Sequence, residues 1–236
     1  MTRLTDIHQH LLWGLDDGPK DAQGMADMLL QAHQQGIGKV VATVHACPGF
    51  KPFDAGLYRE RLAEAQWCSQ ANDLGVEVIP GAEVAWTYHT MTALQHKTVP
   101  TLGNTDYVLL ELWRDISLAE ARNAVKSLTR AGYCPVLAHV ERYRCFRWWP
   151  HTALKFRAET GALFQLNAGT LLNPSGPVER NFVRVMLRSQ GLDAIATDAH
   201  GTPERPVNLQ AAYQYLLENA GEACAQALTV LPGAWK

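Results

Sequence analysis

Histidines and acidic residues occur in this sequence at spacings that suit metal binding. His8 and His10 are separated by one residue, and so are Asp198 and His200. In an extended segment, side chains two positions apart project to the same side of the backbone, so each pair can reach one ion. Imidazole and carboxylate groups together favour divalent transition metals such as manganese, iron or zinc. We therefore expect a metal centre built around these two pairs.

Further candidate ligands follow other short apolar segments. A single ion takes about four to six ligands. The candidates exceed that number, so we expect two or three ions in one cleft, with Glu83 as a carboxylate that could bridge two of them. The remaining histidines lie on a predicted helix or in loops and are expected to be surface or packing residues. The complete set of candidate ligands is His8, His10, Asp17, His45, Glu83, Glu111, His139, Asp198 and His200.

Two arginines follow the candidate ligands closely. Arg142 comes three residues after His139, and Arg205 comes five residues after His200. A guanidinium presents a planar fork of donors that suits phosphate oxygens. Metal ions with two arginines nearby indicate an anionic, tetrahedral substrate. The alternative for each arginine is an ordinary surface ion pair.

The elements that must position these residues alternate along the chain. Segments with strand character have centres roughly 28 to 37 residues apart, which is the length of a βα unit. They cover residues 4–7, 40–44, 76–80, 107–112, 135–139, 163–167 and 194–198. Helical patterns fill residues 22–33, 54–74, 117–132 and 178–190.

This alternation predicts an α/β fold with a closed or nearly closed (β/α) barrel, and a doubly wound open sheet is the alternative. The candidate ligands fall at or just after the carboxyl ends of the predicted strands, where a barrel carries its active site. No break in composition marks a second domain, so residues 1–236 are expected to form one domain.

Composition excludes several classes of protein. Of the 236 residues, 47% are apolar and 19% are charged, which excludes a disordered, collagen-like or coiled-coil chain. The formal net charge of −2 disfavours nucleic acid as a partner. No run approaches the ~18 apolar residues of a membrane helix, and no secretory signal is evident. We therefore expect a cytoplasmic protein without membrane insertion.

The cysteines and the aromatic residues leave further expectations. The five cysteines are expected to be reduced and mostly buried. None of them is followed six positions later by arginine, which disfavours a phosphatase with a cysteine nucleophile. Aromatic residues near the predicted ligands could frame a shallow mouth for an aromatic substrate group, or could pack beneath the loops. They are Trp13, Phe50, Trp86, Tyr88, Trp113, Tyr143, Trp148 and Trp149.

The motifs taken together resemble the PHP (polymerase and histidinol phosphatase) superfamily, and within it the bacterial tyrosine-protein phosphatases encoded with capsule and exopolysaccharide genes. The resemblance spans residue 4 to about residue 215. It rests on Asp6-Ile-His8-Gln-His10, Gly14-Leu-Asp16-Asp17-Gly18-Pro19-Lys20, Gly81-Ala-Glu83, His139-Val-Glu-Arg142-Tyr143 and Asp198-Ala-His200.

The resemblance implies a distorted (β/α)7 TIM-like barrel with a three-metal centre. One ion would be bound by His8, His10, Glu83 and Asp198, a second by Glu83, Glu111 and His139, and a third by Asp17, His45 and His200. Arg142 would be the catalytic, phosphate-binding arginine and Arg205 a second one, while Asp198 could also orient the nucleophile. The expected ion is Mn²⁺, with iron or zinc as alternatives.

The activity implied by the resemblance is hydrolysis of phosphotyrosine by a hydroxide that bridges two ions. The implied partner is a tyrosine autokinase of polysaccharide export, and an oligomer is compatible with the resemblance. The alternatives are a histidinol-phosphate or other small-molecule phosphoesterase, a metal-dependent nuclease, and a metal-binding scaffold without activity. Two segments depart from the family pattern, a less basic segment at 46–49 and an unusually aromatic one at 145–150.

Overall fold

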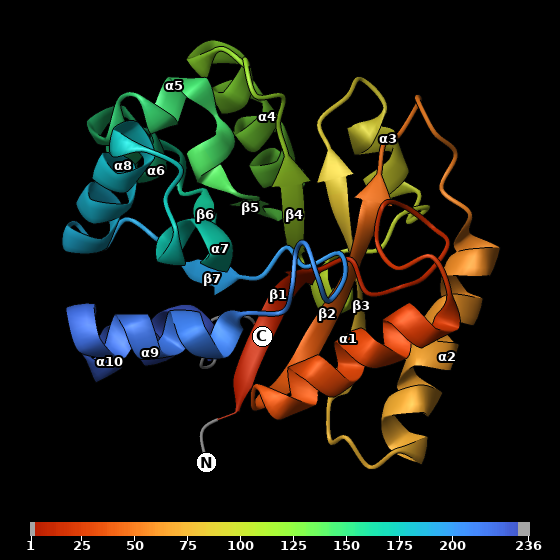
Figure 1. The fold of residues 1–236 in the computed structure, drawn as a ribbon. Helices are drawn as coiled ribbons and strands as arrows, with labels where there is room; N and C mark the ends of the chain where they lie inside the picture. The colour runs from red at the N-terminus through yellow and green to blue at the C-terminus, as the bar shows by residue number, and fades with distance from the viewer. Residues whose placement is uncertain (1–2, 231–236) are drawn as a thin grey trace.

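Seven parallel strands form the centre of the molecule (Figure 1). The computed structural model describes residues 3–230 of the chain. The strands pair in sequence order from β1 to β7, and helices surround them, so the expected distorted (β/α)7 barrel is confirmed. The strands are β1 (Leu4–Gln9), β2 (Ile37–Ala46), β3 (Glu77–Ala85), β4 (Tyr107–Glu111), β5 (Cys134–Leu137), β6 (Leu163–Asn167) and β7 (Ala194–Ala196).

A short seam between β1 and the end of β7 nearly closes the barrel. The Asp198 amide donates a hydrogen bond to the His8 carbonyl over 2.8 Å, and the His10 amide donates to the Ala199 carbonyl over 2.9 Å. Below them, the buried Asp6 carboxylate accepts hydrogen bonds from the Thr197 amide and hydroxyl. The seam contradicts the alternative of an open doubly wound sheet. It also joins the two segments that carry the His8–His10 and Asp198–His200 pairs.

Helices follow most strands and cover the outside of the barrel (Figure 1). The four predicted helices appear as α1, α2, α4 and α8, with ends that differ by a few residues. Several short or weakly amphipathic helices were not predicted. The helices are α1 (Ala22–Gln34), α2 (Ala55–Ala71), α3 (Thr90–Gln95), η1 (Leu102–Asn104), α4 (Leu118–Arg130), η2 (Val140–Arg142), α5 (Arg144–Arg147), α6 (Pro150–Thr160), α7 (Ala168–Leu172), α8 (Pro177–Arg188), α9 (Leu209–Ala220) and α10 (Glu222–Thr229).

Strands β2 and β3 are longer than the sequence pattern predicts. They pair in one continuous register from Lys39 opposite Glu77 to Ala46 opposite Val84. The pairing places His45 directly opposite Glu83, inside the sheet instead of in the loops after it. Both side chains are therefore held by strand backbone, which fixes their positions more firmly than a loop would.

Small and branched apolar side chains fill the barrel interior. Ile7, Val41, Leu109, Val136 and Ala196 belong to this buried cluster. A second, larger core lies where the helices pack on the outside of the strands. Because the interior is packed with apolar atoms, the polar side chains at the carboxyl ends of the strands lie on a rigid apolar layer.

A buried tyrosine connects the ends of β4 and β5. The fully buried Tyr143 hydroxyl donates a hydrogen bond to the Ala138 carbonyl over 2.8 Å and accepts one from the Leu112 amide over 3.1 Å. We expect Tyr143→Phe to lower the free energy of unfolding by about 1–3 kcal/mol, because both backbone groups then lose a partner. Denaturant unfolding measures the change. The matched control is Tyr88→Phe on a fully exposed ring, and equal stability of the two variants would contradict this role.

The cysteines are more accessible than expected. Cys134 is exposed, and the other four are partly exposed. All five are free thiols, as expected of a reduced chain, but the expectation that they are mostly buried is wrong. Within residues 3–230, no helix is both long enough and apolar enough to span a bilayer.

Candidate metal centre

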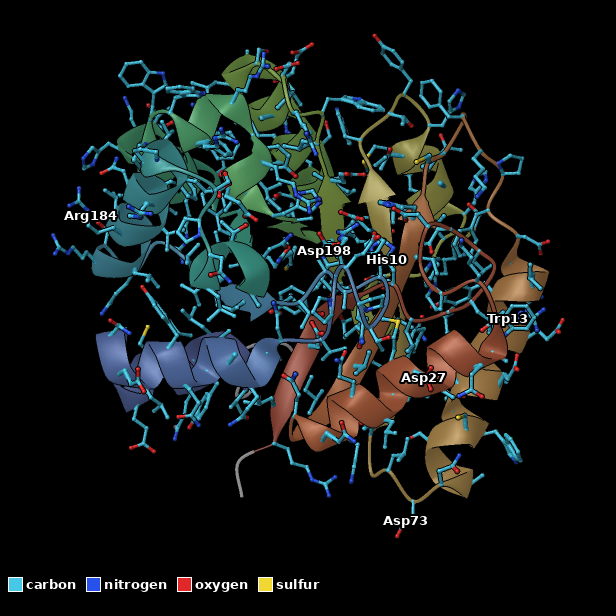
Figure 2. All side chains as sticks on the ribbon, in the orientation of Figure 1. His10, Trp13, Asp27, Asp73, Arg184 and Asp198 are labelled. Carbon is cyan, nitrogen blue, oxygen red and sulfur yellow. The ribbon has the colours of Figure 1, made fainter. Side chains whose placement is uncertain are left out.

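The candidate ligands converge at the carboxyl ends of the strands. In Figure 2 the labelled His10 and Asp198 lie beside each other in the middle of the molecule, whereas Trp13, Asp73 and Arg184 lie toward its edges. Every predicted ligand has a side-chain nitrogen or oxygen within 4.0 Å of another predicted ligand. The sequence-based expectation of a single cluster therefore agrees with the arrangement.

The tightest group lies at the seam of the barrel. His8 Nε2 lies 3.2 Å from His10 Nε2 and 3.4 Å from both Glu83 Oε2 and Asp198 Oδ1. His10 Nε2 lies 3.3 Å from the same Glu83 oxygen and 3.6 Å from the same Asp198 oxygen. All four side chains are buried. These four atoms thus surround one small space.

The other ring nitrogen of each histidine identifies its protonation. His8 Nδ1 lies 3.2 Å from Gln165 Oε1, which also accepts a hydrogen bond from the His139 amide. His10 Nδ1 lies 2.7 Å from Asp16 Oδ2. Because both partners are acceptors, each Nδ1 carries a proton, so Nε2 of each ring is the atom left to bind a cation in the shared space.

The donor set fits a divalent cation. Two imidazole nitrogens and two carboxylate oxygens face one another, which is unfavourable unless a positive charge, from protons on the rings or from a metal ion, lies among them. Ligand atoms ~2.1 Å from a tetrahedral ion lie ~3.4 Å from one another, close to the separations found here. The raised pKa of His10 also shows that this space favours positive charge. Burial disfavours the charged form of His10, yet its hydrogen bonds to Asp16 and Glu83 outweigh burial and raise its pKa to about 10.

A second group surrounds the other side of Glu83. His139 Nε2 lies 2.6 Å from Glu83 Oε1 and 3.7 Å from Glu111 Oε1. His45 Nδ1 lies 3.0 Å from Glu83 Oε2 and 3.9 Å from Glu111 Oε2. Burial and the negative charge of Glu83 raise the pKa of Glu111 to about 7. Glu83 therefore faces both groups, the position expected of a bridging carboxylate.

A third group lies nearer the surface. Asp17 Oδ1 lies 3.4 Å from His45 Nε2 and 3.2 Å from His200 Nε2. His200 Nδ1 lies 2.9 Å from the Asp198 carbonyl, so it carries the proton, and its buried Nε2 has no hydrogen-bond partner. This free lone pair suits a cation. The two ring nitrogens of His45 face different groups, whereas the resemblance placed His45 only with Asp17 and His200.

Two ligand candidates have unusual backbone conformations. His139 has φ 34° and Asp198 has φ 53°, both in the left-handed region that non-glycine residues seldom adopt. His139 stands between β5 and η2, and its amide donates to Gln165 Oε1 over 2.7 Å. Asp198 is held by the seam described above. The fold thus imposes a costly conformation at two positions of the cluster, a pattern typical of functional sites.

Both predicted arginines reach the cluster at the same atom. Arg142 Nη2 donates to Asp198 Oδ2 over 2.7 Å, and Arg205 Nη2 contacts the same oxygen at 2.6 Å. Burial alone would raise the pKa of Asp198, but the charges of the neighbouring His8 and Arg142 outweigh burial and hold the pKa of Asp198 below its usual range. The two guanidiniums border the centre from the solvent side, since each is roughly one-third exposed.

The sequence reasoning missed the residues that hold the ligands. Gln165 and Asn167 of β6 form a chain in which Gln165 donates to Asn167 over 2.8 Å and Asn167 donates to Asp198 Oδ2 over 2.8 Å. Asp16, which the sequence indicated only as part of a motif, accepts hydrogen bonds from the His45 and Gly18 amides as well as from His10 Nδ1. The available signal was the polar Gln165 between two buried apolar residues of a strand.

The aromatic residues divide between the two alternatives. Tyr143 is fully buried, and Trp13 and Trp86 pack partly buried against the core, so these three are packing residues. The other rings are largely exposed and remain available to a partner. They are Phe50, Tyr88, Trp113, Trp148 and Trp149.

Fold and site together define a (β/α)-barrel protein with clustered candidate metal ligands at the carboxyl ends of its strands. The chain belongs to the CpsB/CapC family of capsular polysaccharide synthesis, whose family model matches residues 4–232. This confirms the family expected from the motifs.

Relatives of this family match nearly the whole chain. The tyrosine-protein phosphatase CpsB of Streptococcus pneumoniae is 26% identical over 234 residues, covering 96% of this chain and 95% of CpsB. The tyrosine-protein phosphatase YwqE of Bacillus subtilis is 29% identical over 226 residues, covering 96% and 89%. A crystal structure from work on YwqE and CpsB, described as unique metal-dependent tyrosine phosphatases, superposes with a TM-score of 0.85 at 28% identity, covering 94% of this chain and 89% of that one. A lactonase from Listeria monocytogenes, 12% identical with a TM-score of 0.61 and covering 97% and 92%, shares the fold alone.

Removing the carboxylate behind His10 should weaken metal binding without removing a ligand. We expect Asp16→Asn to lower metal affinity ~10- to 100-fold, because the amide holds the His10 ring less firmly and makes it less basic. Competition with a chelator, followed by elemental analysis, measures the affinity. The matched control is Asp27→Asn on the solvent side of α1. Equal affinities in the two variants would contradict the orienting role.

Proposed function

We propose that this chain is a metal-dependent protein-tyrosine phosphatase. The observation that carries the proposal is the convergence of imidazole nitrogens and carboxylate oxygens on both sides of Glu83, with Arg142 and Arg205 at the border of the cluster. This is a site for cations next to a site for an anion. The names of the relatives, which are tyrosine-protein phosphatases, support phosphotyrosine as the anion.

The three groups define the proposed ligands. His8, His10, Glu83 and Asp198 hold the first ion. Glu83, Glu111 and His139 hold the second, with His45 Nδ1 on the same side. Asp17, His45 and His200 hold the third. We propose two or three divalent ions per chain, with Mn²⁺ as the expected metal and iron or zinc as alternatives, since nitrogen and oxygen ligands of this mixture suit all three.

The ions, when bound, supply Lewis-acid charge and lower the pKa of water from 15.7 toward ~7, so that a nucleophile forms near neutral pH. The protein residues then position the phosphate. Arg142 and Arg205 donate hydrogen bonds to its equatorial oxygens and stabilise them as charge redistributes. Asp198 fixes both guanidiniums through Oδ2 and, in this proposal, orients the nucleophile. The tyrosine leaving group has a pKa of ~10, so it leaves more readily than an alkoxide.

The proposed substrate is a phosphotyrosine-bearing protein, specifically a tyrosine autokinase of the polysaccharide export system, and the proposed location is the cytoplasm. Membership of a capsule-synthesis family supports this partner. The single-domain organisation over residues 1–236 stays a prediction.

One experiment tests the activity. Purified protein is analysed for metal content and assayed, with added Mn²⁺, on a phosphotyrosyl peptide, histidinol phosphate and single-stranded DNA. We expect hydrolysis of the peptide, loss of activity after chelation, and recovery with Mn²⁺. Preference for histidinol phosphate or DNA would reassign the substrate, and full activity in metal-stripped protein would refute the metal-dependent reaction.

A further inference from the structure

A basic cavity of about 660 Å³ adjoins the proposed metal centre. Its lining includes Arg114, Arg142, Arg144, Arg147 and Trp148. Arg142 belongs to both places, because it lines this cavity and its Nη2 contacts Asp198. A substrate whose phosphate lies on Arg142 therefore brings its neighbouring groups to the cavity.

Positive charge in this cavity is only partly compensated. The lining holds four arginines and two carboxylates, Asp115 and Glu179, while Arg142 pairs with Asp198 outside the lining. Asp115 pairs with Arg144 across 2.9 Å, and Glu179 Oε2 accepts a hydrogen bond from the Ser175 amide.

Two of the arginines have no ionic partner among the residues that the structure describes. Neither Arg114 nor Arg147 forms an ion pair with any carboxylate in residues 3–230, and the buried Arg147 Nε has no hydrogen-bond partner there. The cavity therefore offers unused donors beside uncompensated charge, which suits an anion.

The segment that carries Arg142 also fixes the cavity. Helix α5, which begins two residues after Arg142, is anchored by the fully buried Phe146, whose ring packs 5.0 Å from that of Phe156 and 5.6 Å from that of Phe164. The Arg144 amide donates to the Arg114 carbonyl over 2.9 Å, which joins the loop after β4 to α5. Packing therefore fixes the distance between Arg142 and the other arginines of the cavity.

We infer that this cavity binds a second anionic side chain of the substrate polypeptide, near the phosphotyrosine that is hydrolysed. The inference rests on the proposed phosphatase function. Clusters of arginine recognise phosphorylated and acidic motifs, and Trp148 adds an aromatic surface at the rim. The bound group is an aspartate, a glutamate or a second phosphotyrosine, all of which present oxygen anions to guanidinium forks. The unusual 145–150 segment thereby acquires a role in substrate choice.

Kinetics on three peptides tests the inference. They share one phosphotyrosine and differ in its flanks, which are neutral, acidic, or contain a second phosphotyrosine. We expect the protein to show a KM ~10-fold lower for the two anionic peptides than for the neutral one, with similar kcat. Arg114→Gln and the double variant R114Q/R147Q should remove most of this preference. The matched control, R184Q on the solvent side of α8 (Figure 2), should retain it.

The KM values of the three peptides show which anion the cavity binds. A gain with both anionic peptides assigns any anion to the cavity, and a gain with the doubly phosphorylated peptide alone assigns phosphate. Equal KM values for the three peptides, or a preference unchanged in R114Q/R147Q, would overturn the inference while leaving the phosphatase intact. If the double variant fails to fold, R114Q alone decides, since its side chain is exposed. Hydrolysis of none of the peptides would refute the proposed function and this inference with it.

Discussion

Arg142→Ala is expected to lower kcat for phosphotyrosyl peptide ~10²- to 10³-fold, the usual effect of removing one donor that stabilises charge in the transition state. The guanidinium contacts Asp198 at 2.7 Å and lies at the border of the centre, where the phosphate oxygens would be placed. Metal content should stay unchanged, because Arg142 donates hydrogen bonds and offers no ligand atom. Asp198 keeps Arg205 and Asn167 as partners in the variant.

Arg142→Lys and a remote arginine complete this experiment. Lysine restores the charge without the planar fork, so we expect partial recovery of kcat. Arg184→Ala changes an exposed arginine of α8 far from the centre and should leave kcat unaltered. Unchanged kcat in Arg142→Ala, with metal retained, would remove this arginine from the reaction.

Glu83→Gln is expected to remove bound metal and activity together. Glu83 is the residue shared by the first two groups, with carboxylate oxygens 2.6 Å from His139 Nε2 and 3.0 Å from His45 Nδ1. Glutamine keeps the volume of the side chain but offers no negative charge. Since metal charge contributes several kcal/mol to such a reaction, we expect activity to fall ~10³-fold or more.

The same substitution elsewhere on β3 is the control. Glu77 starts the strand, is largely exposed, and pairs with Lys39 at 3.2 Å. Glu77→Gln should leave metal content and activity as they are. Elemental analysis and peptide hydrolysis are measured on both variants, and denaturant unfolding of Glu83→Gln separates loss of the centre from loss of the fold. Full metal loading of Glu83→Gln would contradict the bridging role.

Residue patterns along the chain were sufficient to predict the strands and the end of the barrel where polar residues gather. A buried strand is recognised from a short stretch of sequence. Parallel strands direct their carboxyl ends to one side of the sheet in any strand order. The positions of His8, Glu83 and Asp198 therefore followed from strand ends and motifs.

The residues that hold the candidate ligands in position could not be predicted in the same way. Gln165 contacts His8 across 157 residues of sequence, a relation that only the closed barrel creates. The two ring nitrogens of His45 face different groups of ligands because His45 pairs opposite Glu83 in the sheet. The local sequence pattern did not predict this pairing, since it indicates shorter strands. Tyr143 was ambiguous for a related reason, because an aromatic residue in a loop motif packs inward or outward according to tertiary contacts.

The most direct test of the central claim is anomalous diffraction from crystals of the protein grown with Mn²⁺, recorded at the manganese absorption edge. The proposed centre predicts two or three peaks in the space enclosed by His8, His139, His200 and their carboxylate neighbours, with Glu83 touching two of them. The absence of anomalous density there at full Mn²⁺ loading, or peaks only at the surface, would contradict it.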